Sequence, residues 1–117
     1  MNILDKHYPE ISFKTDAEDL EIMVKLINYC AELIAHENSM SVKIGAVILK
    51  EIRYKFNMKI EQKRGSSKTF LVKLKAHQVF ALFNLFTEKQ SVFSATSYEF
   101  NCVLKYRNQF HQKLTAL

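Results

Sequence analysis

The chain has 117 residues, of which 48% are apolar and 25% charged, and its formal net charge is +5. This balance excludes disordered and low-complexity proteins and predicts one domain that folds on its own. Two glycines and one proline are too few for a many-stranded sandwich or barrel, because such folds need many turn formers. The glycines, Gly45 and Gly65, lie far apart, which excludes the glycine-rich phosphate loops of dinucleotide and nucleotide-hydrolase sites.

The apolar runs, the first residues and the cysteines give an expectation for the cellular compartment. No fully apolar run is longer than Val79–Phe83, which is far short of the ~20 residues of a membrane helix. Residues Met1–Asp5 lack a basic start followed by an apolar stretch, so no secretory signal is expected and we predict a cytoplasmic protein. Cys30 and Cys102 fall in apolar-periodic stretches without a Cys-x-x-Cys pairing, and we expect both to be buried reduced thiols.

The N-terminal residues read as extended chain. Residues 1–14 hold the sole proline, Pro9, and a short alternation at Ile11 and Phe13. This pattern predicts a segment that lies extended along the surface or adds an edge strand. We therefore divide the chain into an extended N-terminal segment, 1–14, and a single α+β domain, 15–117.

A helix is predicted next. Thr15-Asp16-Ala17-Glu18 is a capping box, in which the Thr15 hydroxyl accepts the amide of Glu18. The helix runs to near Glu37, with Asn38 as a left-handed terminator. Its polar residues recur at spacings of four, three and four, at Glu21, Lys25, Asn28 and Glu32. Because the other positions are almost all apolar, we expect this helix to be buried on most sides.

The next segment is ambiguous. Apolar residues in 41–51 fit one face of a helix and one face of a strand equally well. An antiparallel strand there would have to turn around Lys50 and Glu51, where no preferred turn residue is present. We therefore favour a short helix.

The clearest period-two pattern follows. Residues 52–60 alternate apolar and polar side chains over their whole length, which predicts a strand. A Gly/Ser-containing loop, Lys63–Ser67, separates it from a second strand in which alternate apolar residues of 70–74 share a face. The sequence therefore predicts a β-hairpin.

Two helices complete the chain. After Lys75 a weakly polar stripe, His77, Ala81, Asn84 and Glu88, predicts a second largely buried helix. A second capping box, Thr96-Ser97-Tyr98-Glu99, predicts a long amphipathic helix to the C-terminus. The fold class is thus α+β, a small single domain ordered helix, short helix, β-hairpin, helix, helix, with the hairpin packed on the helices.

No pattern points to catalysis. The four histidines, His7, His36, His77 and His111, lack the spacing of a metal cluster. The acidic group Asp16, Glu18, Asp19 and Glu21 lies in and beside a helix first turn, where the macrodipole favours negative charge without further function. We therefore expect no catalytic residue, no metal and no small-molecule cofactor, and we predict that the protein is not an enzyme.

Charge is the most informative feature. Residues 1–40 carry a balance of −5 and residues 41–117 a balance of +10. On the predicted hairpin, basic residues crowd the outer face and the tip: Arg53, Lys55, Lys59, Lys63, Arg64, Lys68, Lys73 and Lys75. A basic two-stranded ribbon has the geometry to contact phosphates of DNA or RNA. A plain solvated face with lysines that blunt the strand edge explains the pattern as well, and an acidic protein partner is a third reading.

The apolar content of the chain gives an expectation for its oligomeric state. Nine Phe and five Tyr are present, and two helices that are apolar on nearly all sides are hard to cover in so small a domain. A symmetric homodimer would supply the missing cover. We therefore expect a non-enzymatic oligomerising or adaptor protein, with a small nucleic-acid-associated protein that contacts phosphates through the basic hairpin as the alternative.

Overall fold

The computed structural model of the chain describes residues 9–34 and 39–117. In chain order the elements are β1 (Glu10–Thr15), α2 (Ala17–Ile34), α3 (Met40–Gln62), β2 (Phe70–Lys75), α4 (Ala76–Lys89), the 3-10 turn η1 (Gln90–Val92) and α5 (Tyr98–Thr115). The predicted α+β class, with four helices and a two-stranded antiparallel sheet packed on them, is confirmed. The predicted helix end near Glu37 with Asn38, and the histidines His7 and His36, lie outside the described residues.

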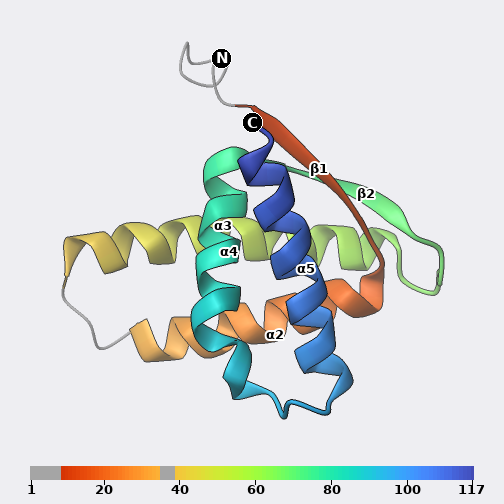
Figure 1. Cartoon of the computed structure of the whole chain (residues 1–117). Helices are drawn as coiled ribbons and strands as arrows, with labels where there is room; N and C mark the ends of the chain where they lie inside the picture. Colours follow the sequence, from red (N-terminus) through yellow and green to blue (C-terminus); the bar gives the residue numbers. More distant parts are fainter. Residues whose placement is uncertain (1–8, 35–38) are drawn as a thin grey trace.

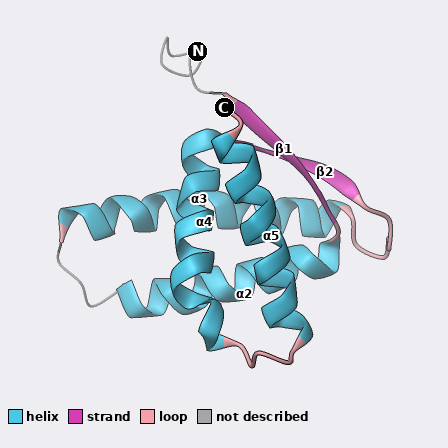
Figure 2. Ribbon diagram, viewed as in Figure 1, coloured by secondary structure: helices cyan, strands magenta, loops and turns pink. Residues whose placement is uncertain are grey.

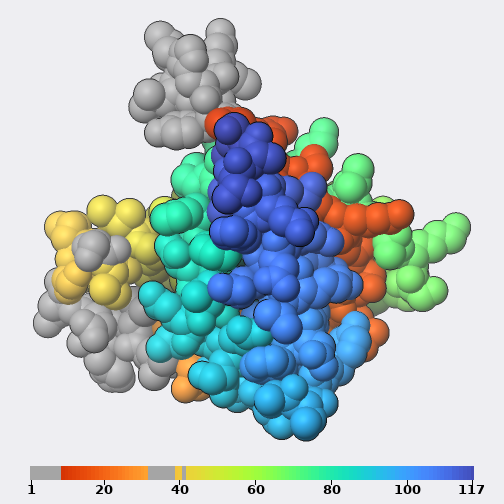
Figure 3. All heavy atoms as spheres, viewed as in Figure 1, coloured from red at the N-terminus to blue at the C-terminus, as the bar shows by residue number. Residues whose placement is uncertain are grey.

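The helices form two crossed layers. Figure 1 shows α4 and α5 side by side in front of α2 and α3, which cross behind them. The two strands lie along one margin of this bundle, above one end of α3 (Figure 2). In the space-filling view, α4 and α5 cover the centre of the face and the strands border it (Figure 3). Among the described helices, none has the length and apolar character needed to cross a bilayer.

The N-terminal segment contributes β1. Ile11, Phe13 and Thr15 are buried while the residues between them face outward, which is the alternation of a half-buried strand. β1 pairs antiparallel with β2, in a register that sets Phe13 opposite Val72. The edge-strand interpretation of this segment is therefore correct.

The first helix begins one residue later than the capping box indicated. The side chain of Asp16 accepts the amide of Asp19 at 2.8 Å, so Asp16 caps α2 in place of Thr15. Thr15 is buried because the alternation of β1 turns its side chain into the core. As expected, α2 is buried on most sides, with Leu20, Met23 and the other inward apolar residues packed against the remaining helices.

The strand predicted over 52–60 was wrong, because α3 is one continuous helix of 23 residues. Within it Leu49, Ile52 and Phe56 are buried, at spacings of three and four, whereas Tyr54 and Met58 are exposed. The alternating segment therefore also contains apolar residues at helical spacing, and these form one narrow buried stripe of α3. No proline interrupts the run, and no glycine stands between Gly45 and Gly65, so the helix favoured for 41–51 continues to Gln62. Its residues are mostly good helix formers, and helix extension is cooperative.

With α3 helical, the hairpin is replaced by a sheet between distant strands. The chain turns at Gly65, whose positive φ of 82° favours glycine, and then enters β2. The predicted second strand is correct, with Val72 and Leu74 buried. Its partner is β1, which is separated from it in sequence by α2 and α3.

The last two helices were located correctly, with a shift at one cap. The amide of Lys75 donates to Gln78 Oε1 at 3.0 Å at the start of α4. At α5 the cap is Ser97, whose Oγ accepts the amide of Phe100 at 3.1 Å, rather than Thr96. Ser97 also donates to the carbonyl of Ser94, so its side chain joins the loop to the helix.

An aromatic cluster joins the sheet to the helices. Phe13 of β1 packs edge-to-face on Phe56 of α3 at 6.3 Å and on Phe110 of α5 at 5.0 Å between ring centroids. Phe110 in turn stacks on Phe86 of α4 at 5.9 Å. Because aromatic pairs of this kind add about 0.5–1.5 kcal/mol to the burial of their area, Phe13 fastens the short sheet to both helical layers.

Candidate functional site

The eight basic residues assigned to the predicted hairpin do not share one face. Four of them, Lys55, Lys59, Lys73 and Lys75, line two adjoining cavities between α3, β2 and the start of α4. The cavities have volumes of about 720 and 360 Å³, and both are lined by Lys55 and Met58. The structure therefore brings half of the predicted residues together, across a groove rather than on a ribbon.

The other four basic residues lie outside these cavities. Arg53 donates at 3.0 Å to the side-chain oxygen of an asparagine on α2. Arg64 forms an exposed ion pair with Glu61 at 2.6 Å. Lys63 caps the end of α3 and lies over an aromatic ring of β2 at 5.5 Å, and Lys68 is exposed in the loop. No common surface is formed by all eight.

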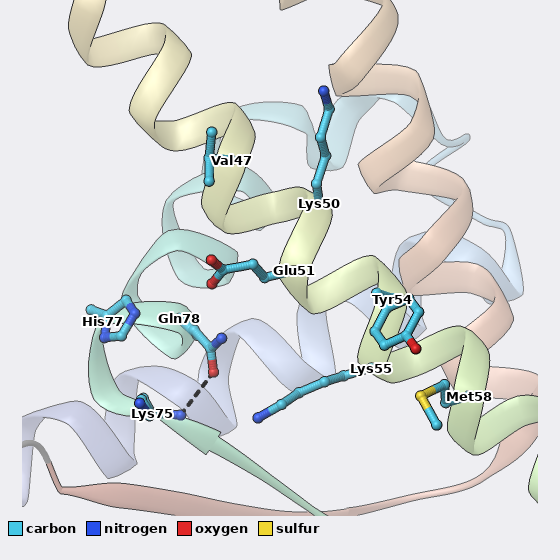
Figure 4. Close-up of a pocket in the computed structure, with 9 residues that line it drawn as sticks. All are labelled: Val47, Lys50, Glu51, Tyr54, Lys55, Met58, Lys75, His77 and Gln78. Atoms are coloured by element: carbon cyan, nitrogen blue, oxygen red, sulfur yellow. Dashed lines mark hydrogen bonds between the residues drawn. The ribbon is translucent and has the colours of Figure 1, made fainter. Parts of the chain in front are cut away.

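We call the two adjoining cavities the α3 groove. It is lined by residues of α3, of β2 and of the first turn of α4: Val47, Lys50, Glu51, Tyr54, Lys55, Met58, Lys59, Gln62, Leu71, Val72, Lys73, Lys75, His77 and Gln78. In Figure 4, the Glu51 and Lys55 side chains point from α3 toward the junction of β2 and α4, where Lys75 and Gln78 lie. The groove is thus an open trench along one side of α3.

The charge of the groove is strongly one-sided. Among the described residues that line it, five are lysines and one, Glu51, is acidic. Lys55 and Lys59 come from successive turns of α3, and Lys73 comes from β2. Like charges that face one gap repel each other and attract an anionic ligand.

Large apolar side chains are exposed in the same groove. Val47 is 56% exposed, Tyr54 68%, Met58 46% and Leu71 58%. Exposed apolar side chains that gather in one place and are bordered by charge mark interaction surfaces more often than isolated ones do. Tyr54 and Met58 are the residues that the strand interpretation placed in the core, so the correction in secondary structure is also what exposes them.

A third cavity lies between α3 and α4, nearer the start of α3. It has a volume of about 610 Å³ and is bounded by residues of α2, α3 and α4, among them Cys30, Ile48, Leu49, Phe80 and Leu85. Phe80 is 56% exposed there, although its helix was expected to be largely buried. Burial raises the pKa of the Cys30 thiol, so it remains protonated at neutral pH.

A group of hydrogen-bonded polar side chains surrounds the buried Asp19 at the opposite end of α2. Asp19 is 2% exposed and accepts hydrogen bonds from Tyr98 at 2.7 Å, from Tyr106 at 2.5 Å and from Lys105 at 3.4 Å. The Tyr106 hydroxyl also bonds Thr15 Oγ1 at 2.9 Å. We call these five residues the Asp19 cluster.

The pKa values in this cluster follow from those contacts. Burial raises the pKa of Asp19, but the hydrogen bonds from Tyr106 and Tyr98 and the charge of Lys105 outweigh it, so the pKa lies below its ordinary value. Burial and the bond to Asp19 raise the pKa of Tyr106. Burial and the nearby Asp19 charge raise the pKa of Cys102 to about 12. Asp19 is therefore ionised and Tyr106 is protonated at neutral pH, and both side chains are hydrogen-bonded within the fold, which is typical of a structural cluster.

Sequence reasoning missed this cluster and part of the groove. The acidic group at the start of α2 was correctly placed at a helix N-terminus, but nothing local distinguishes Asp19, which is paired with a tyrosine 87 positions away. Lys50, Val47 and Tyr54 were missed as groove residues because their segment was divided between a short helix and a strand. Apolar residues three and four apart, at Leu49, Ile52 and Phe56, are the sequence signal that agrees with the helix, but the alternation over 52–60 agrees with a strand as well.

Within the described residues, no group of three or more His, Cys, Asp or Glu side chains is arranged to hold a metal ion. Comparisons of the chain with protein-family models, with curated proteins and with solved structures found no significant similarity. The geometry of the α3 groove is therefore the observation from which a function can be inferred.

Proposed function

We propose that this protein is a non-enzymatic adaptor whose α3 groove binds an acidic, partly apolar segment of a protein partner. The observation that supports the proposal is the composition of the groove, in which five lysines and one glutamate surround exposed apolar side chains. A ligand that satisfies both features must carry carboxylates and apolar side chains together. Protein segments are the common ligands with that combination.

Apolar burial is the main reason to favour a protein segment over a simple polyanion. Covering exposed apolar area contributes roughly 25 cal/mol per Å², and phosphates cannot supply that cover. Tyr and Met are enriched in protein interfaces; Tyr54 lines the larger cavity of the groove and Met58 lines both. Lysines at the rim steer an acidic partner and fix its register more than they add affinity.

Binding of DNA or RNA is the second candidate. It is favoured by the meeting of Lys55, Lys59, Lys73 and Lys75 around one groove. It is disfavoured by the loss of the predicted ribbon, which leaves Arg53 and Arg64 bonded elsewhere. Phosphate contacts release counterions, so an affinity that falls steeply with salt would identify this candidate.

Self-association of the chain is the third candidate. The apolar face of α2 that suggested a dimer is covered by the other helices of the same chain. Several exposed apolar residues lie instead along α3, where Ile44 is 55% exposed in addition to the groove residues. A second copy would bring the same lysines against each other, so the charge disfavours a symmetric contact through the groove.

The test is a selection from a random peptide library with three forms of the full chain. The wild type is compared with Lys55→Glu/Lys73→Glu, which reverses two exposed groove charges, and with the control Lys25→Glu/Lys113→Glu, which changes net charge equally at other sites. We expect the wild type and the control to enrich peptides rich in Asp, Glu and apolar residues. We expect the groove variant to bind the enriched peptides at least about tenfold more weakly.

Three results would contradict the proposal. One is enrichment without acidic bias, and another is an equal loss in the groove variant and the control. The third is salt-sensitive binding of labelled DNA or RNA that the groove variant abolishes while no peptide is enriched. Light scattering on the same samples reports whether a second copy occupies the groove.

A further inference from the structure

The backbone of β2 has one free edge. Within residues 9–34 and 39–117, β2 pairs only with β1. The amide of Ala76 donates to the carbonyl of Pro9 at 3.0 Å. Because bonded and non-bonded pairs alternate in an antiparallel ladder, the even-numbered residues of β2 make the bonds to β1. The amide and carbonyl groups of Leu71 and Lys73 therefore point away from β1.

This free edge borders the α3 groove. The smaller cavity, of about 360 Å³, lies between β2 and the C-terminal half of α3 and is lined by Lys55, Met58, Lys59, Gln62, Leu71, Val72 and Lys73. The free backbone groups thus border a cavity with an apolar contact, Met58, and three lysines. The edge offers hydrogen bonds over a strand of six residues, about 20 Å long.

We propose that the acidic segment enters this groove as an extended chain and adds a third strand to the sheet at the free edge of β2. The inference rests on the proposed function and specifies how the ligand binds. Addition of a strand to an exposed sheet edge uses main-chain hydrogen bonds for affinity and alternate side chains for specificity. Leu71 and Lys73 supply four such backbone groups, and Lys55, Lys59 and Lys73 supply the charge.

Charge selects the occupant. Lysines on an edge strand prevent pairing with an identical strand, so Lys73 disfavours addition of a second copy at the same edge. The described residues that line the smaller cavity include no carboxylate. An acidic strand meets no repulsion there and places its carboxylates near the three ammonium groups. The bound segment is therefore one in which acidic and apolar residues alternate, the pattern of a strand with two different faces.

The experiment uses a capped peptide of about eight alternating glutamate and valine residues and two N-methylated forms of it. One form is methylated on the odd-numbered amides and the other on the even-numbered amides, so charge and composition are matched. Binding to the full chain is measured by calorimetry at low salt. In strand addition only one set of amides faces β2, so we expect one form to lose at least about tenfold in affinity while the other stays within about threefold of the parent.

The outcomes separate the two proposals. Equal affinities for both methylated forms, or equal losses, overturn strand addition while binding of the parent peptide leaves the acidic-segment proposal intact. Absence of parent binding overturns both. Two variants of the protein test the same hydrogen bonds from the side of β2. Lys73→Pro removes the outward amide and the charge, whereas Lys73→Ala removes the charge alone. Proline is tolerated on an edge strand where its amide position faces solvent, and we expect Lys73→Pro to bind at least about fivefold more weakly than Lys73→Ala.

Discussion

The Asp19 cluster and the α3 groove both contain charged side chains, and they differ in how those charges are satisfied. Asp19 is buried and accepts three hydrogen bonds from side chains of α5. In the groove, Lys55 and Lys73 are exposed, and only one carboxylate is present among the described lining residues. Charges that are paired inside the fold contribute to stability, whereas like charges left around an apolar trench are available to a ligand.

The location of the two regions supports this distinction. The Asp19 cluster joins α5 to β1 and to the first turn of α2, which come 91 and 87 positions earlier in the hydrogen bonds of Tyr106. Loss of any member therefore loosens a contact between elements. The groove is lined by exposed and half-buried side chains of α3, whereas Ile52 and Phe56 of that helix are buried in the core. Its rim can change without disturbing the core.

The largest effect is expected from Asp19→Asn. The substitution keeps the shape of the side chain but removes the charge and replaces one acceptor with a donor group. The buried hydroxyl of Tyr106 then loses its strongest partner, and we expect the free energy of unfolding to fall by about 2–3 kcal/mol. Urea unfolding followed by circular dichroism measures this change.

The matched control is Glu18→Gln, one position earlier in the same helical turn and exposed. It also removes a negative charge near the helix N-terminus, so we expect a loss of about 0.5 kcal/mol or less. Similar losses for the two variants would show that the helix macrodipole, rather than the buried cluster, accounts for the effect of Asp19.

The pH dependence of stability sharpens the comparison. The pKa of Asp19 is lowered in the folded protein from an ordinary value of 3.8, so the unfolded chain binds its proton more readily. The stabilisation is therefore present above about pH 5 and is lost as the pH falls through the folded-state pKa. We expect the difference in unfolding free energy between wild type and Asp19→Asn to shrink steadily between about pH 5 and pH 2. Parallel curves for the two proteins would refute this role.

Most of the fold could be predicted from local patterns. The positions of α2, β2, α4 and α5 follow from apolar spacing, and the alternation at Ile11 and Phe13 already indicated an edge strand. Residues 52–60 could not be assigned in the same way. Their alternating pattern fits a helix as well as a strand, because the helix buries only Ile52 and Phe56 of this segment. That choice depends on Phe13, which packs on Phe56 from a strand about forty residues earlier.

The candidate site was predicted only in part, for the same reason. A lysine-rich segment was evident, and the gathering of Lys55, Lys59 and Lys73 around one groove needed the correct placement of α3 against β2. The Asp19 cluster needed more, since Tyr98 and Tyr106 meet Asp19 only when α5 packs over the start of α2. Burial of one carboxylate among four neighbours is a tertiary effect that local propensity does not encode.

The smallest effect, with the opposite sign, is expected from removing groove charge. Lys55→Gln/Lys73→Gln relieves repulsion between exposed like charges, so we expect the unfolding free energy to rise by up to about 0.5 kcal/mol at low salt. Salt screens such exposed charges, and at an ionic strength of about 0.5 M the screening length is only ~4 Å. The gain in unfolding free energy should therefore vanish near about 0.5 M salt. Lys25→Gln is the control, because Lys25 follows Glu21 by one helical turn in the acidic part of the chain and its loss should destabilise slightly. Destabilisation by the groove variant comparable to that of Asp19→Asn would mean that the groove lysines are paired within the fold, and the distinction between the two regions would fail.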